Sequence, residues 1–391
     1  MNLSRRANSI TSSPTMAVLE EVAKLKDKGI EVLDLGPGQP DFHTPDNIKL
    51  SAYKAIDENF TRYTEPAGIL ELRKAVIEKY RRDFGAQYKP NEVIISSGGK
   101  HSLFNLMLAI IEEGDEVLIP APYWVSYPQQ VILAGGKLRH IELQEENQFV
   151  LTRDILEQSL TANTKAVIIN TPSNPTGSVI PEEELEKIAE LALKKRIYII
   201  FDECYEKLTY DGIKHFSLAS LQEAKEVTLI INSVSKTYAM PGWRIGFALG
   251  PEKVISTVTK LQSHTTSAPC SISQKAAVEA LNGSQDFIKE MLAQYTLRRN
   301  YMVEALNSIT GISCHKPQGA FYIFPNITRL LESTNINSSE EFSRQLVSHA
   351  RVAVVPGSSF GKEGYLRLSF ATSIEVIKES MKRMKEFVEG L

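Results

Sequence analysis

The chain of 391 residues contains only three cysteines, Cys204, Cys270 and Cys314, and they lie far apart. Disulfide frameworks and zinc sites need cysteines, or cysteines with histidines, at short regular spacings. We therefore predict no metal site and a reducing, cytoplasmic location. Long apolar runs are also missing, since none approaches the ~18 residues that a membrane-spanning helix requires. The sequence thus predicts no association with a membrane.

An excess of basic charge is missing as well. There are 44 Lys+Arg residues and 47 Asp+Glu residues, so the formal net charge is 44 − 47 = −3. Binding to nucleic acid needs a strong positive field, which this composition does not supply, and we predict no nucleic-acid partner. With 42% hydrophobic and 23% charged residues, the composition is that of a soluble globular protein, and the length suggests two or three domains.

Short apolar runs recur along the first 250 residues, and each is followed by a polar loop marked by glycine or proline and then by a helix-like stretch. Their β-branched residues do not alternate with polar ones, which is typical of strands buried on both faces of a parallel sheet. Alternating strands and helices predict an α/β fold. The runs are residues 93–95, 116–119, 166–169, 197–201 and 227–231.

The pattern changes after residue 250. Helix-like sequence covers residues 251–308, and a mixed pattern follows, with strands near 320–324, 352–356 and 365–369 and helices near 338–348 and 373–389. We predict a large domain of residues 46–290 with a mainly parallel sheet flanked by helices, and a smaller α+β domain of residues 291–391. Residues 1–45, with a helix near 16–28, are predicted to pack with the small domain.

Two polar residues lie after buried runs, Asp202 directly after residues 197–201 and Lys236 in the polar loop that follows residues 227–231. Ligands bind beyond the carboxyl ends of parallel strands, so Asp202 and Lys236 are candidate functional residues. A buried carboxylate needs a partner, so Asp202 is a helix N-cap, a member of a buried ion pair, or a carboxylate that awaits a cation from a ligand. Lys236 is a solvated surface residue or, in a desolvated and cation-rich site, an amine that forms a Schiff base.

A phosphate site is also indicated. Gly98, Gly99 and Lys100 join a strand to a helix, whose first N–H groups can bind an anion. The hydroxyls of Ser233 and Ser235 and the guanidinium of Arg244 flank Lys236 in sequence and suit the same anion. Two other glycine motifs, at residues 36–38 and 357–362, lack the spacing of nucleotide-binding loops, which argues against a nucleotide-dependent enzyme.

A phosphate, an aldehyde for Lys236 and a ring cation for Asp202 are all present in pyridoxal 5′-phosphate (PLP). With these residues in place, the chain resembles the class I aminotransferases of the aspartate aminotransferase family, bacterial-type branch, over essentially its whole length. The resemblance rests on the shared order of residues 35–42 (LGPGQPDF), Tyr63, 98–101 (GGKH), 123–124 (YW), 174–177 (NPTG), 202–205 (DECY), 233–236 (SVSK), 244–246 (RIG) and 365–369 (YLRLS).

The resemblance implies fold type I, PLP as cofactor and the following catalytic roles. Lys236 binds the cofactor covalently and later moves the proton of the substrate α-carbon, while Asp202 keeps the pyridine nitrogen protonated. Tyr205 and Asn174 hydrogen-bond the ring oxygen, and Trp124 stacks on the ring instead of serving as a core tryptophan. The phosphate is implied to lie on Gly99, Lys100, Ser233, Ser235 and Arg244, with Tyr63 reaching the phosphate of the neighbouring subunit in a homodimer with shared active sites.

For the substrate, the resemblance implies that Arg367 grips the α-carboxylate, with Gly38, Asn174 and Trp124 closing the site around it. Lys100, Ser13 and Thr15 match groups that bind a second carboxylate, which favours amino transfer from L-aspartate to 2-oxoglutarate. Relatives that use prephenate resemble one another in having a basic residue at the position of Thr11, which argues against prephenate. The effects of Pro14 and of His101, where glutamine is expected, stay open.

Two alternatives stay open at this stage. One is an aminotransferase for alanine, aromatic amino acids or prephenate on the same scaffold. The other is a regulatory binding protein that keeps the fold without the reaction, against which the intact set of Lys236, Asp202, Arg244 and Arg367 weighs.

Overall fold

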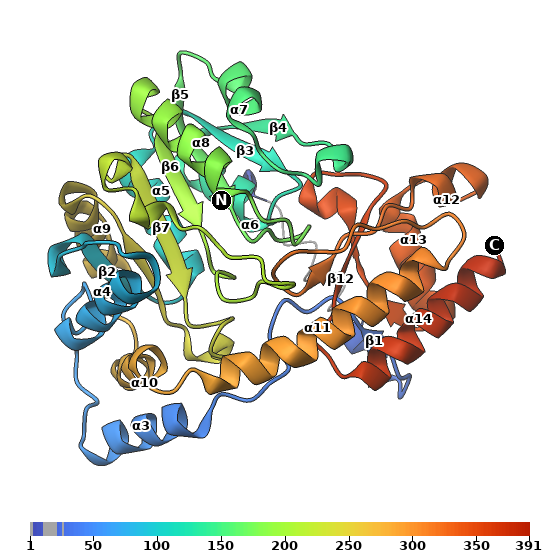
Figure 1. Ribbon diagram of the computed structural model, residues 1–391, viewed down its shortest axis with the longest axis horizontal. Coiled ribbons are helices and arrows are strands. Elements are labelled where there is room, and N and C mark those ends of the chain that lie inside the picture. Colours follow the sequence, from blue (N-terminus) through green and yellow to red (C-terminus); the bar gives the residue numbers. More distant parts are fainter. Residues whose placement is uncertain (1–2, 11–21, 26) are drawn as a thin grey trace.

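The computed structural model describes residues 3–10, 22–25 and 27–391. Its centre is a seven-stranded sheet in the order β2-β8-β7-β6-β5-β3-β4 (Figure 1). The strands are β2 (Val93–Ser96), β3 (Glu116–Ala121), β4 (Lys137–Glu142), β5 (Thr164–Asn170), β6 (Tyr198–Asp202), β7 (Thr228–Ser233) and β8 (Gly246–Leu249).

The sheet is mainly parallel, as predicted, and all five apolar runs are strands in it. β8 is the exception, because it runs antiparallel to both β2 and β7. Neither β8 nor β4 was predicted. β8 has only four residues and directly follows the Arg244 motif, and β4 is an edge strand of sequence KLRHIE with mostly exposed side chains. An edge strand has one side open to solvent and therefore lacks the apolar signature of a buried strand.

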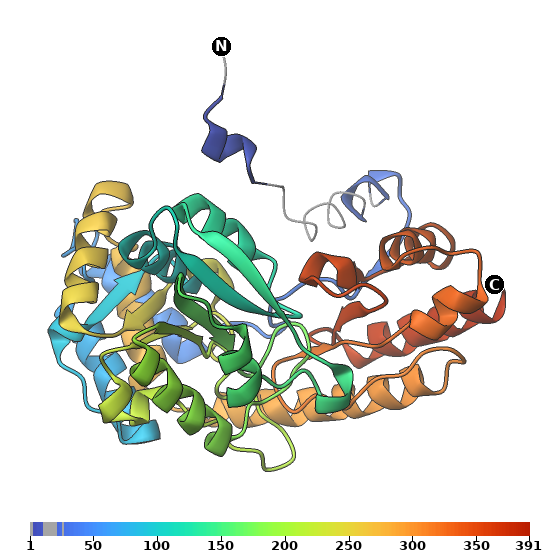
Figure 2. The same ribbon diagram turned by 90° about the horizontal axis from the view of Figure 1, so that it is seen from above.

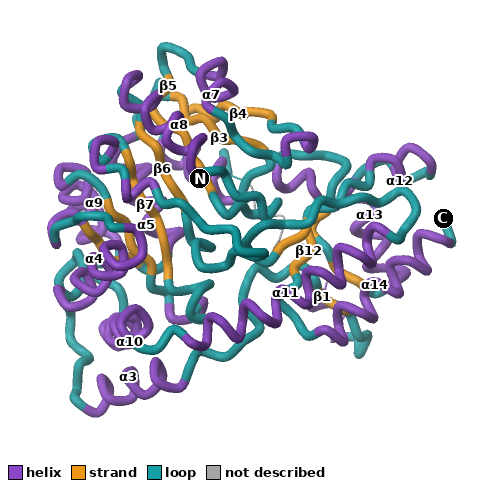
Figure 3. The backbone as a smooth tube through the Cα atoms, viewed as in Figure 1, coloured by secondary structure: helices purple, strands orange, loops and turns teal. Residues whose placement is uncertain are grey.

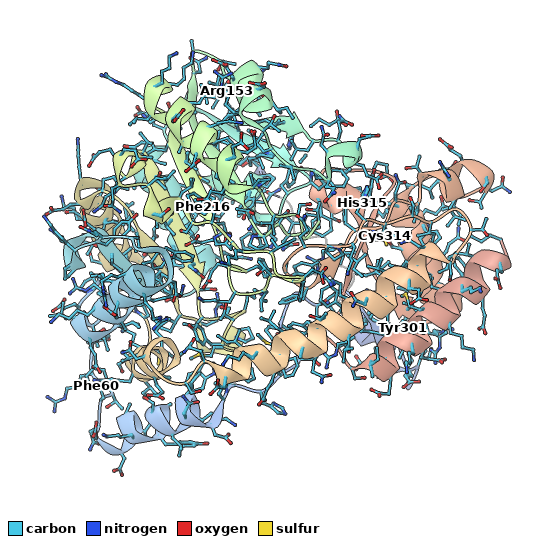
Figure 4. All side chains as sticks on the ribbon, in the orientation of Figure 1. Phe60, Arg153, Phe216, Tyr301, Cys314 and His315 are labelled. Atoms are coloured by element: carbon cyan, nitrogen blue, oxygen red, sulfur yellow. The ribbon has the colours of Figure 1, made fainter. Side chains whose placement is uncertain are left out.

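Both faces of this sheet are buried under helices, which Figure 2 shows from above. Neighbouring residues of one strand belong to different cores: Val93 and Ile95 pack in one apolar cluster and Ile94 in another. Phe216, which is labelled in Figure 4, is partly buried and packs against the cluster that contains Val93 and Ile95. The helices of this part are α3 (Asp46–Asp57), α4 (Leu70–Phe84), α5 (Gly99–Ile110), α6 (Ser126–Ala134), α7 (Arg153–Ser159), α8 (Glu182–Lys195), α9 (Glu252–Thr265) and α10 (Ser271–Asn282).

A smaller α+β part follows. Its antiparallel sheet has the order β11-β12-β9, and a third apolar cluster lies between this sheet and its helices. The long helix α11 connects the two parts (Figure 3). The elements are α11 (Asp286–Asn307), β9 (Tyr322–Ile323), α12 (Thr328–Ser333), α13 (Ser339–Gln345), a π-helical turn (Leu346–Ala350), β10 (Val352–Ala353), β11 (Val355–Pro356), β12 (Leu366–Ser369) and α14 (Ile374–Glu389).

The N-terminal segment contacts the small part. A short helix α1 (Arg5–Asn8) comes first, and β1 (Leu33–Asp34) later pairs in parallel with β10. Residues 22–25 and 27 of the helix predicted near 16–28 are helical, and Val22 packs with Val347. Lys28 lies in a turn, and residues 16–21 and 26 lie outside the described residues.

The domain boundaries at residues 45 and 290 stay predictions. Near the second boundary α11 changes its packing partners. Ile288 belongs to the core of the large sheet, whereas Met291 belongs to the core of the small part.

Candidate active site

A cavity of about 470 Å³ lies at the carboxyl ends of β5, β6 and β7, where the large sheet meets the small part. This is the edge at which open parallel sheets bind ligands. Most of the predicted site residues line it together: Gly38, Gly99, Lys100, Trp124, Asn174, Asp202, Tyr205, Ser233, Ser235, Lys236, Arg244 and Arg367.

Lys236 lies in the turn after β7, and its ammonium group donates to the carbonyl of Gly38. Burial, together with the positive charges of Arg367 and Arg244, lowers the pKa of Lys236 to about 8, although Cys204 and Asp202 act in the opposite direction. A larger fraction of this amine is therefore neutral at neutral pH than for a solvated lysine. A neutral amine is the form that attacks an aldehyde.

Asp202 is the last residue of β6 and is 7% exposed. One carboxylate oxygen accepts the Tyr127 hydroxyl at 2.8 Å, and the other accepts the backbone N–H of Cys204 at 3.1 Å. Burial raises the pKa of Asp202. No helix begins here, and within the part of the chain that the structure describes Asp202 forms no ion pair. Of the three interpretations, a carboxylate that takes its cation from a ligand remains.

Arg367 projects from β12 and is 3% exposed. It donates to the side-chain oxygen of Asn174 at 3.2 Å and to the carbonyl of Gly36 at 2.6 Å, and its Nε is buried with no partner among the described residues. The guanidinium lies 4.5 Å from the centre of the Tyr322 ring. A buried guanidinium that forms no ion pair within the described chain, and that has an N–H to spare, is a site for an anion.

The turn from β2 into α5 brings backbone N–H groups and Arg244 together. Gly98 has a φ of 92°, and a Cβ on it would lie 2.2 Å from Nη2 of Arg244. A Cβ on Gly246 would lie 2.2 Å from the backbone nitrogen of Gly99. Both positions therefore require glycine for Arg244 to reach the N-terminus of α5. With Ser233 and Ser235 beside it, this group of donors fits a phosphate.

Lys100 and Trp124 form another wall of the cavity. The Lys100 ammonium lies 5.0 Å from the centre of the Trp124 ring. Burial, followed by the charge of Arg244, lowers the pKa of Lys100. His101, whose role the sequence left open, accepts the backbone N–H of Ser97 at 3.3 Å through Nδ1 and so supports the turn before α5.

Sequence reasoning missed several residues of the cavity, among them Tyr127, Cys204 and Tyr322. Tyr322 comes from β9 of the small part, and its hydroxyl lies 2.9 Å from that of Tyr205. Tyr127 follows Trp124 by three residues, the spacing of neighbours on a helix face, and that spacing was the available signal. No comparable signal marks Tyr322, because its contact with Tyr205 arises only in the folded chain.

Three predicted residues are not in the cavity as described. Tyr63 is 98% exposed and does not line it. Ser13 and Thr15 lie outside the described residues, as do Thr11 and Pro14.

A partly buried amine, an unpaired buried carboxylate, an unpaired buried guanidinium and a phosphate cradle, at the edge of this sheet, define a PLP-dependent aminotransferase of fold type I. The sequence model of the family "Aminotransferase class I and II" matches residues 30–384, and the chain belongs to this family.

The chain is similar over its full length to named members. It is 46% identical to aspartate aminotransferase of Geobacillus stearothermophilus over 100% of both chains. It is 43% identical to a probable aspartate/prephenate aminotransferase of Rickettsia felis, over 98% of this chain and 95% of that one. Among solved structures, aspartate aminotransferase from Thermus thermophilus with maleate has a TM-score of 0.94 at 39% identity, with 99% of each chain covered.

Among the described residues, no helix combines the length and the apolar character needed to span a bilayer. Nor do these residues contain a group of three or more His, Cys, Asp or Glu side chains placed to hold a metal ion.

Proposed function

We propose that this protein transfers the amino group of L-aspartate to 2-oxoglutarate, giving oxaloacetate and L-glutamate. The observation that carries the proposal is that Asp202 and Arg367 are both buried in one cavity and that neither forms an ion pair with a side chain of the described chain. A charge buried without a partner is costly, so the cavity is built for ligands that bring a cation to Asp202 and a carboxylate to Arg367.

PLP, when bound, supplies a conjugated ring that accepts the electron pair of the substrate α-carbon. In our proposal the amine of Lys236 holds the cofactor aldehyde and later moves the α-proton. Asp202 keeps the ring nitrogen protonated, and Tyr127 orients its carboxylate. Tyr205 and Asn174 face the ring oxygen, while Trp124 covers the ring.

The phosphate is proposed to lie on the N–H groups of Gly99 and Lys100 and on the side chains of Ser233, Ser235 and Arg244. These donors come from two separate segments, the start of α5 and the connection from β7 to β8, so they hold the cofactor at its phosphate end while Asp202 holds the opposite end of the ring. Such two-ended binding fixes the orientation of the ring over Lys236.

Substrate choice is proposed to depend on a second cation. Arg367 binds the α-carboxylate, with Asn174 and Gly38 beside it, and the Lys100 ammonium, which lies against Trp124, binds the side-chain carboxylate of aspartate or 2-oxoglutarate. The similar Thermus protein was solved with maleate, a dicarboxylate, which supports a site for two carboxylates. Ser13 and Thr15 would assist from outside the described residues.

Replacing Lys100 tests this choice. We expect Lys100→Ala to lower kcat/KM for aspartate at least about tenfold while alanine, which has no second carboxylate, changes by less than about threefold. Steady-state rates with aspartate, alanine, phenylalanine and prephenate provide the measurement, and exposed Lys137→Ala is the control. Equal losses for aspartate and alanine would show that Lys100 acts through the phosphate instead.

The pKa of Lys236 gives a second prediction. Because only the neutral amine attacks an aldehyde, the rate at which cofactor-free protein combines with PLP should rise with pH and level off above a pH of about 8. A solvated lysine would level off only near ~10.4. Stopped-flow absorbance measures this rate. A rate that keeps rising to pH 10 would contradict a desolvated Lys236.

We further propose a homodimer with shared active sites. Tyr63 is almost fully exposed in the single chain, and α3 exposes Leu50, Tyr53 and Ile56 beside it in sequence. Sedimentation should give twice the 43.6 kDa of one chain. Leu50→Asp should shift the protein toward monomer and weaken PLP retention, whereas Leu297→Asp, at an equally exposed leucine of α11, should do neither. A monomer that retains PLP as well as the wild type does would refute shared sites.

Two alternatives are less well supported. The Rickettsia relative is named for prephenate as well as aspartate, but the position that bears on prephenate, Thr11, lies outside the described residues. A binding protein without the reaction has no need for an amine of lowered pKa in the same cavity as Asp202 and Arg367. We also propose a cytoplasmic location.

A further inference from the structure

Four buried polar side chains form a continuous network behind the strand ends that carry Asp202 and Lys236: Tyr80, Glu203, His215 and Asn232. None of them lines the cavity, and the proposed reaction does not use them. Glu203 has no exposed surface at all and directly follows Asp202. Burying a carboxylate costs free energy unless the carboxylate is paired or hydrogen-bonded.

Both oxygens of Glu203 have a partner. Oε1 accepts the hydroxyl of Tyr80 at 2.6 Å, and Oε2 lies 2.8 Å from Nε2 of His215. The Nδ1 of His215 is buried and has no partner among the described residues. Both bonds of the carboxylate are therefore directed away from the cavity, and they fix the residue that follows Asp202.

Tyr80 extends this network to the neighbouring strand. Besides donating to Glu203, its hydroxyl accepts from the side-chain nitrogen of Asn232 at 3.3 Å. The side-chain oxygen of Asn232 accepts the backbone N–H of Ser233 at 2.7 Å. Tyr80 thus connects the end of β6 to the end of β7 from a third element, α4.

This connection lies where the backbone pairing of the two strands stops. The β6–β7 ladder ends with Asp202 opposite Ile231, and the last backbone bond runs from the N–H of Glu203 to the carbonyl of Ile231. Beyond that point the strands diverge into the two loops that carry the site. There the side-chain hydrogen bonds of Tyr80, and no longer backbone pairing, connect β6 to β7.

We propose that Tyr80 is a positioning residue which, with Glu203 and Asn232, sets the spacing between Asp202 and residues 233–236. That spacing decides whether one PLP molecule can meet Asp202 with its ring nitrogen and the hydroxyls of Ser233 and Ser235 with its phosphate. The inference rests on the proposed PLP site and adds residues that do not touch the ligand.

Tyr80→Phe isolates the bridge from the packing. The ring of Tyr80 packs edge-on against Phe247 and lies beside Phe84, and phenylalanine keeps those contacts. The variant lacks only the hydroxyl. Tyr238→Phe is the matched control, because Tyr238 is buried in the same core but its hydroxyl donates to Gln285.

The test compares wild type and both variants in three measurements: the Kd for PLP from absorbance titration of cofactor-free protein, the pH midpoint of the colour change of bound PLP, and the unfolding temperature of the cofactor-free protein. We expect Tyr80→Phe to weaken PLP binding about tenfold, equivalent to about 1.4 kcal/mol, and to move the pH midpoint. Tyr238→Phe should leave the Kd for PLP within about twofold of wild type and should not move the pH midpoint.

A purely structural role gives a different result. If Tyr80→Phe lowers only the unfolding temperature and keeps the wild-type Kd and pH midpoint, the inference is wrong although the proposed function stands. If wild type itself binds no PLP, the proposed function fails and the inference with it. Should Tyr80→Phe not fold, Glu203→Gln replaces a charge-assisted bond by a neutral one and should move both measurements in the same direction by less.

Discussion

Lys236→Ala is expected to lower kcat/KM for amino transfer by on the order of 10⁵-fold. The amine of Lys236 both holds the cofactor aldehyde and moves the α-proton, so its loss removes two functions from the same position. Lys100, the other lysine of the cavity, lies against Trp124 and does not replace it. Coupled assays of oxaloacetate formation measure the effect.

Folding should survive this substitution. The side chain of Lys236 makes one hydrogen bond, to the carbonyl of Gly38, and carries a charge that burial disfavours. Circular dichroism and thermal unfolding of the cofactor-free variant should therefore match wild type closely. The exposed Lys253→Ala variant controls for lysine removal in general. A Lys236→Ala protein with normal kcat would mean that another group is the nucleophile.

The large sheet could be predicted from the sequence because most of its strands are buried on both faces. An uninterrupted apolar run such as residues 166–169 leaves few other interpretations, and the structure has β5 there. β4 could not be found in this way, because the charged residues of an edge strand read as a loop. The reversal that makes β8 antiparallel depends on the path of the chain after Lys236, which no local pattern encodes.

The residues of the site likewise divide into those that a local sequence pattern predicts and those that it does not. The rule that ligands bind beyond the carboxyl ends of parallel strands was enough to single out Asp202 and Lys236. Arg367 carries no local signal, because it is one residue of a short strand, and only the family resemblance identified it. The pairing of Tyr205 with Tyr322 joins residues 117 positions apart and follows from the docking of the small part.

The buried network around Glu203 could not be predicted for a further reason. In the sequence, Glu203 is one more acid beside Asp202, and Tyr80 is one apolar position of an amphipathic helix. Their contact depends on which face of α4 packs on the strand ends. The structure alone therefore separates the two neighbouring acids, one facing the cavity and the other facing away from it.

Asp202→Asn is the other substitution with a large expected effect, a fall in kcat of about 10³-fold. Asparagine keeps the size of the side chain but not the negative charge, so the ring nitrogen loses the group that keeps it protonated. The amide is also a poorer match for its surroundings. In the wild type, the Tyr127 hydroxyl donates to one carboxylate oxygen and the N–H of Cys204 donates to the other. The amide nitrogen of asparagine cannot accept a hydrogen bond, so one of these two donors loses its acceptor.

The effect of this variant should appear mainly in kcat and in PLP affinity, and less in KM for aspartate, because Arg367 and Lys100 are untouched. Rates at saturating aspartate, together with the Kd for PLP, separate these terms, and Asp115→Asn, outside the cavity, is the control. A variant that binds PLP weakly but regains wild-type kcat at saturating PLP would show that Asp202 serves binding alone. Because its carboxylate forms no ion pair within the described chain, we expect instead that the charge of Asp202 acts on the ring throughout the reaction, and that excess PLP does not restore the rate.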